Sequence, residues 1–356
     1  MSCTDYTGDL YIEITNNCNL KCLHCYNDST PLKGKRYITS EEFQGIIDKA
    51  LDCNTKSIAL SGGEPLLNPH LLDIISLILN KGLSCRIVTN GTLIDRSFLR
   101  SIGPSVSIQI SLDGVKAESH ERLTGVVGSF NDTVLAIELL NNMNIPYTIK
   151  SIISPYNCDE LNDMVQFAID HKAKGISFSL LQPYGRAVNN QDSLYINHHS
   201  ILQLYLNKLL PLFNQYPGFV SGPKIQNTRC PLLCANDSQE QRFVVSPRID
   251  VKGNVYPCAT FISPKFAVGN IFKQSFHEIF SSKAFFDLIT YMDLREKYVD
   301  ECRNCIVSNF CGRGCPASSL ETDSINSNYY CQMVKWKMMS DAVKGQIEVL
   351  KNEDEQ

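Results

Sequence analysis

The feature of this sequence that most constrains its fold is a regular alternation of short apolar runs with longer amphipathic stretches, which continues to about residue 215. Such alternation is typical of strand–helix units built around a parallel sheet. Six of the runs predict strands, because each is near-continuously apolar or β-branched, as a strand buried on both faces should be. They are Leu10–Thr15, Ser57–Leu60, Cys85–Thr89, Ser105–Ile110, Tyr147–Ile152 and Gly175–Leu180. We therefore expect an α/β fold, a partial (β/α)6 TIM-type barrel that is open or partly closed.

The helices between these strands are expected to begin at residues that often cap helix N-termini. These residues are Thr39-Ser40, Asn68-Pro69, Asp95 and Asn157 to Asp159. A further helix is expected at about Ser200–Phe213, before a stretch rich in proline and glycine that runs from Tyr216 to Pro223. Proline and glycine interrupt regular structure, so we place the main domain boundary there and assign 1–220 to the barrel.

The chain beyond this boundary has a different character. From Cys230 to Cys331 it is rich in turns and punctuated by cysteine. The elements expected in it are a hairpin formed by Phe243–Ser246 and Ile249–Tyr256 around Gly253, and a helix at about Ser275–Met292. Such a segment has too little core to fold by burial alone, so we expect a metal to stabilise it. We assign 221–335 to this cysteine-rich domain and 336–356 to a C-terminal helix and acidic tail.

Charge and apolar patterning exclude several classes of partner. Lys and Arg total 33 against 37 Asp and Glu, a formal charge of −4, so nothing favours sequence-independent binding to nucleic acid or to an anionic membrane. No run approaches the roughly 18 to 20 apolar residues that span a bilayer, and Met1–Leu10 lacks the basic and apolar regions of a signal peptide. We expect a cytoplasmic protein with a small, near-neutral or peptide substrate.

Cysteine is unusually frequent, with fifteen residues in a chain without an export signal. A disulfide framework is excluded because the cytosol keeps such thiols reduced, so the cysteines must be free, redox-active or bound to metal. Three cluster at Cys18, Cys22 and Cys25. Eight lie beyond residue 229, namely Cys230, Cys234, Cys258, Cys302, Cys305, Cys311, Cys315 and Cys331. The scattered Cys3, Cys53, Cys85 and Cys158 are interpreted as core or incidental thiols.

The first cluster lies in the loop directly after the first predicted strand, where a βα barrel places its active site. Its spacing lets three thiolates converge on one centre, and iron–sulfur clusters are normally held by four. The fourth is missing locally, which leaves an iron open to a small molecule. The competing interpretations are a structural zinc with a distant fourth ligand, such as His24, or reduced thiols without metal.

Cys18, Cys22 and Cys25 resemble the C-x3-C-x2-C signature of the radical S-adenosylmethionine (SAM) superfamily. Ser61-Gly62-Gly63-Glu64-Pro65 is similar to its GGE motif, which implies that Gly62, Gly63 and Glu64 hold the amino group of the SAM methionine. Glycine lets a backbone approach a ligand closely, and a carboxylate accepts from an ammonium. A Gly-Gly pair alone is more often a plain turn.

Further residues at strand ends are assigned to the SAM site by the same resemblance. They are His24, Asn90, Ser111, Asp113 and Arg122, of which Ser111 and Asp113 are expected near the ribose and carboxylate. The competing interpretation of Ser111 and Asp113 is a helix cap with an Asp-Gly turn, and Arg122 can equally be a solvated charge. The run from Gln182 to Ala187 resembles a turn near the adenine and is interpreted as scaffold.

The later cysteines resemble the SPASM domain, which holds two auxiliary 4Fe-4S clusters. The resemblance implies a distal cluster bound by Cys302, Cys305, Cys311 and Cys331, and a nearer one bound by Cys230, Cys234, Cys258 and Cys315. The assignment of Cys230 departs from the usual spacing. Zinc ribbons are the competing interpretation of C-x2-C, and a thioredoxin-type site is disfavoured because that motif belongs at a strand–helix junction.

The resemblance implies an enzyme that cleaves SAM reductively to a 5′-deoxyadenosyl radical, which abstracts hydrogen from its substrate, with three 4Fe-4S clusters as cofactors. Proteins of this kind mostly modify ribosomally made peptides by crosslinking or epimerisation. The expected partners are a peptide or small protein and an electron donor such as flavodoxin or ferredoxin. The first strand begins at about Leu10, which leaves no room for an N-terminal leader-binding domain, so a leader would be recognised by a separate leader-binding protein or by the SPASM face.

Three functions compete with peptide maturation. SPASM enzymes that modify haem precursors have a similar sequence around the cysteines, but a polyanionic tetrapyrrole needs a basic lining that is not visible. Anaerobic sulfatase maturation is disfavoured because Ala259, where that family has an Asp base, cannot accept a proton. A non-catalytic iron–sulfur protein would not need Gly62, Gly63 and Glu64.

Overall fold

The computed structural model describes residues 3–6, 8–30, 36–182, 184–223, 230, 232, 242–298, 305, 315 and 317. Four predicted ligands, Cys234, Cys302, Cys311 and Cys331, lie outside the described residues, as does the predicted helix and acidic tail over 336–356. The domain boundaries expected near 220 and 335 therefore remain predictions.

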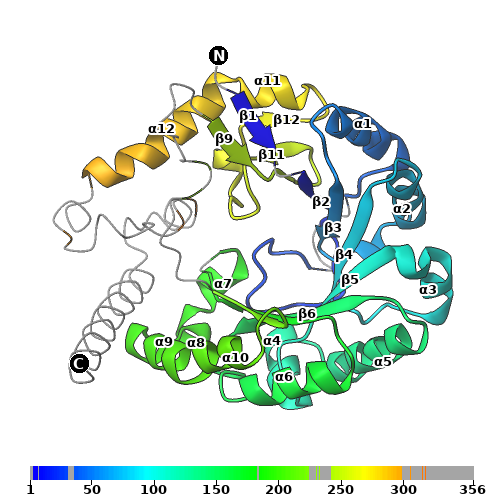
Figure 1. Ribbon diagram of the computed structural model, residues 1–356, viewed down its shortest axis with the longest axis vertical. Helices are drawn as coiled ribbons and strands as arrows, with labels where there is room; N and C mark the ends of the chain where they lie inside the picture. Colours follow the sequence, from blue (N-terminus) through cyan, green and yellow to red (C-terminus); the bar gives the residue numbers. More distant parts are fainter. Residues whose placement is uncertain are drawn as a thin grey trace, which may run out of the picture.

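The described chain is built on one large sheet. Its strands are β2 (Asp9–Thr15), β3 (Ser57–Gly62), β4 (Ser84–Thr89), β5 (Val106–Ser111), β6 (Tyr147–Ile153), β7 (Ile176–Leu180), β8 (Val220–Ser221), β10 (Arg248–Ile249), β11 (Asn254–Tyr256) and β12 (Gly269–Asn270). They lie in the order β12-β11-β10-β2-β3-β4-β5-β6-β7-β8. Strands β2 to β7 pair in parallel, each with the next. The six predicted strands are confirmed, and the sheet is the open arc of a partial barrel (Figure 1).

Helices follow the strands and cover the outer side of this arc (Figure 1). In the barrel they are α1 (Ser40–Leu51), α2 (Leu71–Asn80), α3 (Arg96–Ile102), α4 (Ala117–Thr124), α5 (Ser129–Asn142), α6 (Leu161–Asp170), α7 (Arg186–Asn189), α8 (Gln191–Leu194), α9 (His198–Leu204) and α10 (Leu210–Gln215). The helix expected over 200–213 is thus α9 and α10, joined by a π-helical turn at Tyr205–Leu209. The later helix expected over 275–292 is two helices, α11 (Phe276–Phe280) and α12 (Lys283–Tyr298).

The core lies between the sheet and the helices. Helix α2 shows why it packs there, because Leu71, Ile74, Ile75 and Ile78 are buried and recur at the helical spacing of one face. On the sheet, Ile12 and its parallel neighbours are almost fully buried. Burial of this stripe against apolar strands is the main force that holds each helix on the sheet.

Two of the predicted helix caps are confirmed and two are wrong. The Thr39 hydroxyl accepts from the N–H of Glu42 at 3.2 Å, and the Asp95 carboxylate caps α3. Asn68 does not cap α2, because its Oδ1 accepts from the N–H of His70, which precedes the helix, while its amide donates to two buried main-chain carbonyls. Asn157 does not cap α6, because its Oδ1 accepts from the N–H of Ser154, while its amide donates to the carbonyl of Asp113 at 3.0 Å. Both asparagines therefore join loops at the strand ends.

The predicted hairpin is correct around Gly253 but wrong in its first strand. Strands β10 and β11 form the antiparallel pair, and Gly253 adopts a φ of +80° in the turn between them. The segment expected to begin the hairpin is instead β9 (Arg242–Val245), which pairs in parallel with β1 (Cys3–Tyr6). Strand β10 also pairs in parallel with β2, so the C-terminal segment continues the barrel sheet.

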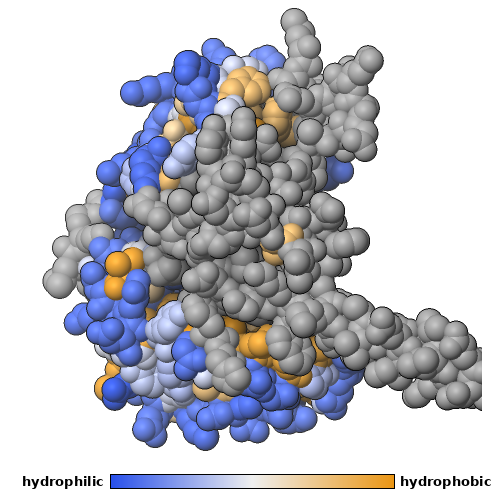
Figure 2. Space-filling model, turned by 90° about the vertical axis from the view of Figure 1, so that its left-hand side faces the viewer, coloured by the Kyte–Doolittle hydropathy of each residue, from blue (hydrophilic) through white to orange (hydrophobic). Residues whose placement is uncertain are grey.

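No single helix among the described residues is long and apolar enough to cross a membrane. The pair α4 and α5 together meets the length and composition of a span, but it is bent by 107°. Figure 2 shows one face of the molecule, and among the described residues visible there hydrophilic side chains predominate and apolar side chains gather in small patches.

Candidate active site

The predicted site residues lie at the carboxyl ends of the parallel strands. The loop between β2 and α1 carries Cys18, Cys22 and Cys25, and it crosses the inner side of the arc of strands (Figure 1). The ends of β3, β4 and β5 carry Gly62 to Glu64, Asn90 and Ser111 to Asp113. Because the carboxyl ends of parallel strands meet at one edge, the fold brings these segments together, as a barrel active site requires.

The three thiols of the loop after β2, here called the cysteine loop (residues 16–30), lie close together in partly or fully buried positions. Burial raises the pKa of the Cys18 thiol to about 12 and holds that of Cys22 well above its usual range. The neighbouring thiols Cys18 and Cys25 raise the pKa of Cys22 further. Such a group ionises only when a cation binds to it, which is the chemistry of thiolate ligands.

The three thiols of the cysteine loop are the groups that would hold an iron–sulfur cluster. Among the described residues, no three His, Cys, Asp or Glu side chains converge on one point that could hold a metal ion. A 4Fe-4S cluster does not require such convergence, because each thiolate binds a different iron. Cys18, Cys22 and Cys25 would hold that cluster, which leaves the fourth iron for SAM.

Arg186 of α7 holds the cysteine loop in place, a role that the sequence analysis missed when it assigned this turn to the scaffold. Its Nε donates to the carbonyl of Cys22 at 2.7 Å, and its Nη1 donates to the carbonyl of Ser29 at 2.8 Å. Its N–H donates to the carbonyl of Cys25 at 2.9 Å. One residue therefore satisfies three carbonyls of the loop, on both sides of the last cysteine.

Gly62 approaches the last residue of β2, and Gly63 approaches the cysteine loop that follows it. A Cβ on Gly62 would lie 2.2 Å from the carbonyl oxygen of Thr15, and one on Gly63 would lie 2.1 Å from that of Asn17. The N–H groups of Gly63 and Glu64 donate to the same two carbonyls at 2.8 and 2.7 Å. The close approach that glycine permits here is thus to the backbone at the end of β2 and at the start of the cysteine loop.

Glu64 is fully buried and joins the ends of β3 and β4. Its carboxylate accepts from the Thr89 hydroxyl at 2.7 Å, from the N–H of Asn90 at 2.9 Å and from the N–H of Leu66 at 3.2 Å. Burial raises the pKa of Glu64 from 4.5 to about 7, although these donors favour the ionised form. A carboxylate has about four acceptor positions, so one remains for a ligand ammonium, and that role stays a prediction.

Asn90 connects the end of β4 to the cysteine loop. Its side-chain amide donates to Asn19 at 2.9 Å, and its carbonyl oxygen accepts from the N–H of Thr92 at 2.9 Å. Asn19 in turn donates to the Thr92 hydroxyl at 2.7 Å. The predicted contact of Asn90 with SAM is untested, but its present bonds fix the loop between two of its cysteines.

Asp113 and His24 lie in contact across the site. His24 Nε2 lies 3.4 Å from Asp113 Oδ2, and the other carboxylate oxygen of Asp113 accepts from the N–H of Ile152 at 2.8 Å. The N–H of Asp113 donates to Nδ1 of His120 at 3.1 Å, so a neutral His120 carries its proton on Nε2. Burial lowers the pKa of His120 and favours this neutral form. Asp113 is therefore held between the cysteine loop and the end of β6.

The two remaining predicted SAM contacts lie at the rim. Ser111 is the last residue of β5 and is half-buried. Arg122 is exposed, and its guanidinium stacks over the ring of Tyr156 at 5.1 Å. This stacking orients the cation without using its hydrogen-bond donors, so the guanidinium can still bind an anion.

Of the predicted auxiliary ligands, Cys230, Cys258, Cys305 and Cys315 lie within the described residues and are half-buried. Burial raises the pKa of Cys258 to about 11, and the neighbouring Cys315 raises it further. The fold therefore brings together Cys258 and Cys315, two residues that the sequence analysis assigned to the same nearer cluster.

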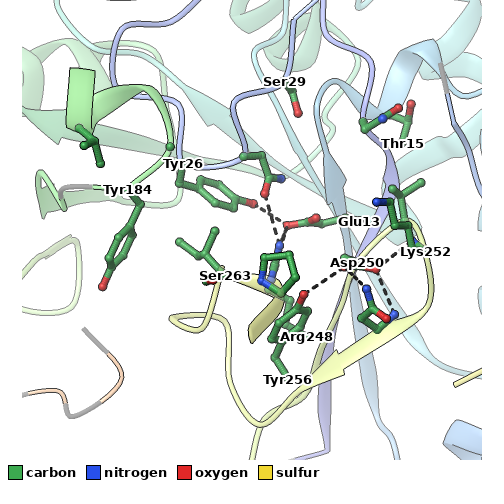
Figure 3. Close-up of a pocket in the computed structure, with 18 residues that line it drawn as sticks. Glu13, Thr15, Tyr26, Ser29, Tyr184, Arg248, Asp250, Lys252, Tyr256 and Ser263 are labelled. Atoms are coloured by element: carbon green, nitrogen blue, oxygen red, sulfur yellow. Dashed lines mark hydrogen bonds and ion pairs between the residues drawn. The ribbon is translucent and has the colours of Figure 1, made fainter. Parts of the chain in front are cut away.

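A polar cavity of about 560 Å³ lies between β2, the cysteine loop and the β10–β11 hairpin (Figure 3). One wall is a buried ion pair, in which Nη2 of Arg248 lies 2.7 Å from Oε1 of Glu13. Tyr26, the residue after Cys25, donates to the same oxygen at 3.2 Å. The sequence analysis missed this pair, although a glutamate within an otherwise apolar predicted strand was a signal for it.

Comparisons with known proteins agree with the site. The model of the radical SAM superfamily matches residues 12–168, and that of an iron-sulfur cluster-binding domain, SPASM, matches residues 244–306. The antilisterial bacteriocin subtilosin biosynthesis protein AlbA of Bacillus subtilis is 27% identical over 93% of this chain and 72% of its own length. An AdoMet-dependent heme synthase of Methanosarcina barkeri is 30% identical over 54% of this chain and 56% of its own length.

Solved structures share the fold. The protein anSMEcpe with bound AdoMet has a TM-score of 0.71 at 21% identity, covering 97% of this chain and 99% of that one. Streptococcus suis SuiB bound to its precursor peptide SuiA has a TM-score of 0.70 at 15% identity, covering 90% of this chain and 74% of that one. At these identities the likeness shows the fold alone, a partial barrel followed by a smaller segment.

Proposed function

Because the chain belongs to the radical SAM superfamily and carries a SPASM domain, it is an enzyme that uses SAM and iron–sulfur clusters, and we propose that it matures a peptide. When bound, the reduced cluster supplies an electron to SAM and so provides the 5′-deoxyadenosyl radical that abstracts hydrogen from the substrate. The product would be a crosslinked or epimerised peptide. The electron would come from a flavodoxin or ferredoxin.

The observation that carries this proposal is the charge balance of the cavity beside the cysteine loop. Four of its lining residues are charged, the acids Glu13 and Asp250 and the bases Arg248 and Lys252. Arg248 is already paired with Glu13, so it offers no free positive charge. A polar lining without excess charge suits a peptide segment, in which main-chain amides need hydrogen-bond partners.

The same cavity disfavours a tetrapyrrole substrate. A haem precursor carries several carboxylates, and burying them requires cationic partners. Of the two bases in the described lining, Arg248 is neutralised by Glu13, and Lys252 is exposed. The haem alternative is retained because the heme synthase of Methanosarcina barkeri matches 54% of the chain.

Sulfatase maturation and a non-catalytic role have less support. Ala259 is exposed at the position where a sulfatase maturase needs an acid, and a methyl group accepts no proton. A non-catalytic role does not explain why Gly62, Gly63 and Glu64 are fitted so closely to the cysteine loop. Three 4Fe-4S clusters remain our expectation for the complete enzyme.

The protein's own groups would prepare the site for this chemistry. Arg186 and Asn90 fix the cysteine loop from two sides. Asp113, held by the N–H of Ile152 and paired with His24, offers a carboxylate at the strand ends. A ligand bound there would find its polar partners already oriented, which reduces the entropy lost on binding.

The proposal is tested with anaerobically reconstituted enzyme, SAM and a chemical reductant. Deoxyadenosine release is measured beside product mass, with short precursor peptides encoded next to the gene and with a tetrapyrrole precursor as competing substrates. We expect a peptide product that has lost hydrogen or changed configuration. Turnover of the tetrapyrrole alone would favour the haem alternative. Absence of SAM cleavage would refute the proposed enzymatic activity.

A further inference from the structure

The ion pair of Arg248 and Glu13 is buried far more deeply than ion pairs usually are. Arg248 is 2% exposed and Glu13 is 5% exposed. Removing two charges from water is costly and is compensated only when both partners are held in good geometry with further hydrogen bonds. Arg248 Nε donates to Glu13 Oε1 at 2.8 Å, and Nη2 lies 2.7 Å from the same oxygen. Packing alone therefore does not explain why this ion pair is buried.

Arg248 contacts the two loops that carry predicted cluster ligands. Its Nη2 donates to the side-chain carbonyl of Asn27, two residues after Cys25, at 3.3 Å. Its Nη1 donates to the carbonyl of Phe261, three residues after Cys258, at 2.8 Å. Its planar face stacks on the ring of Tyr256 at 4.7 Å. A single guanidinium thus joins the cysteine loop to the turn that follows Cys258.

A chain of hydrogen bonds extends these contacts to the end of β3. The hydroxyl of Tyr26 donates to Glu13 at 3.2 Å and lies 3.2 Å from the hydroxyl of Tyr11. Tyr11 donates to the hydroxyl of Ser61 at 2.5 Å, and Ser61 directly precedes Gly62. Glu13 and Tyr26, at one end of this chain of contacts, line the cavity that Figure 3 shows.

We propose that Arg248 is a positioning residue that fixes the cysteine loop relative to the turn after Cys258, and thereby sets the geometry between the SAM site and the auxiliary cluster. The inference rests on the proposed function for the presence of the clusters, and on the contacts above for the link. Lysine cannot replace arginine here, because Glu13, Phe261 and Asn27 accept from three different nitrogens of the planar guanidinium, whereas lysine has a single nitrogen.

The test uses reconstituted full-length enzyme with Arg248→Lys, Arg248→Met and the double variant Glu13→Gln/Arg248→Met. The double variant removes the buried carboxylate that Arg248→Met alone leaves without its cationic partner. Arg86→Met is the matched control, because Arg86 is an exposed arginine on β4. Iron content, the electron paramagnetic resonance spectra of the reduced clusters with SAM, and deoxyadenosine released per product are measured for each.

We expect the double variant to keep its iron and its fold but to show altered cluster spectra. Its ratio of deoxyadenosine to product should rise by the order of tenfold to a hundredfold, because a misplaced reacting group loses that much rate. Arg248→Lys should lie between the wild type and the double variant, and Arg86→Met should match the wild type.

Wild-type spectra and a wild-type ratio in a folded, iron-loaded double variant would overturn the inference. A second outcome would also overturn the inference. Arg248→Met would lose iron, the double variant would recover it, and the spectra of the double variant would match the wild type. The ion pair would then serve only to pack the core. Wild-type enzyme that holds clusters yet cleaves no SAM would instead refute the proposed function, and the spectra would still decide the role of Arg248.

Discussion

Gly63 illustrates how closely single residues are fitted around the cysteine loop. A Cβ at this position would lie 2.1 Å from the carbonyl oxygen of Asn17, which is backbone and cannot rotate away. We expect Gly63→Ala to destabilise the protein by about 1–3 kcal/mol, the usual effect of overpacking, and to weaken iron binding by the first cluster. Thermal unfolding and iron content measure the two effects.

The control for this change is Gly45→Ala. Gly45 lies in α1 with no atom within 4 Å of an added Cβ, so alanine should stabilise the helix by about 0.5–1 kcal/mol and leave iron content unchanged. Equal iron content in Gly63→Ala and wild type would show that the cysteine loop tolerates displacement from β3.

Glu64 predicts a dependence of stability on pH. In the unfolded chain this carboxyl ionises near its ordinary pKa of 4.5, whereas burial raises the pKa to about 7 in the folded protein. Between these values the folded state retains a proton that the unfolded state has released. The contribution of Glu64 to stability is therefore full below pH 4.5, falls as the pH rises, and is lost above about 7.

Glu64→Gln should remove this dependence, because an amide does not titrate in that range. Relative to the variant, the wild type should lose on the order of 2 to 3 kcal/mol of unfolding free energy between pH 5 and 8, measured by urea denaturation. Parallel profiles for the two proteins would contradict the raised pKa.

Glu64→Gln should also weaken SAM binding by about 1.5–3 kcal/mol with all clusters loaded. Loss of iron from the variant instead would show that the residue is purely structural.

At the scale of elements, α7 and the cysteine loop depend on each other through Arg186. Replacing Arg186 with Met leaves the carbonyls of Cys22 and Ser29 without their donor, so we expect lower retention of the first cluster and at least tenfold slower SAM cleavage. Arg186→Lys should recover only part of this loss, because lysine cannot reach both carbonyls in the same geometry.

The measurement for Arg186 is iron content and deoxyadenosine release in the same preparations. Arg86→Met serves again as an exposed arginine that should change neither. If Arg186→Met retains full iron and full SAM cleavage, the loop is held by its remaining contacts, such as the bond from Lys21 to Thr124 at 3.0 Å.

The elements themselves were largely predictable, because the local pattern of apolar and polar residues indicates the alternation of strands and helices. The strands β2 to β7 and the cap at Thr39 follow from apolar runs and capping residues. The pairing of β9 with β1 could not be predicted from the sequence. It depends on a contact between strands more than two hundred residues apart and not on any local signal. For the same reason Asn68 and Asn157, good caps in isolation, proved to bind distant carbonyls.

At the scale of the whole molecule, the three clusters should contribute equal amounts of iron but different functions. Two groups of cysteines contain eleven residues, enough for three 4Fe-4S clusters with one open iron, so the reconstituted enzyme should hold roughly twelve irons. Replacing Cys18, Cys22 and Cys25 with Ala should lower the iron by about a third and abolish SAM cleavage, because only that cluster has an open position. Iron analysis and deoxyadenosine release check both, and retained cleavage would refute the assignment.

Much of the site was predictable from spacing, since Cys18, Cys22 and Cys25 are close in sequence and Gly62 to Asp113 follow successive strands. The wall of the cavity was not, because Glu13 and Arg248 are separated by 235 residues and meet only through the pairing of β10 with β2. Arg186 lies outside the cysteine motif, so its bonds to that loop had no local signal either.

The pairing of β10 with β2 also has a consequence for synthesis on the ribosome. Strand β2 ends at Thr15, whereas its neighbour β10 begins at Arg248, so more than two hundred residues are synthesised between them. At typical elongation rates of about 5–20 residues per second, one edge of β2 waits on the order of ten to fifty seconds with its N–H and C=O groups unpaired. An exposed edge recruits other strands, so the nascent barrel is most prone to aggregation during this interval. Slower translation between residues 223 and 242 would lengthen this interval and lower the yield of correctly folded enzyme.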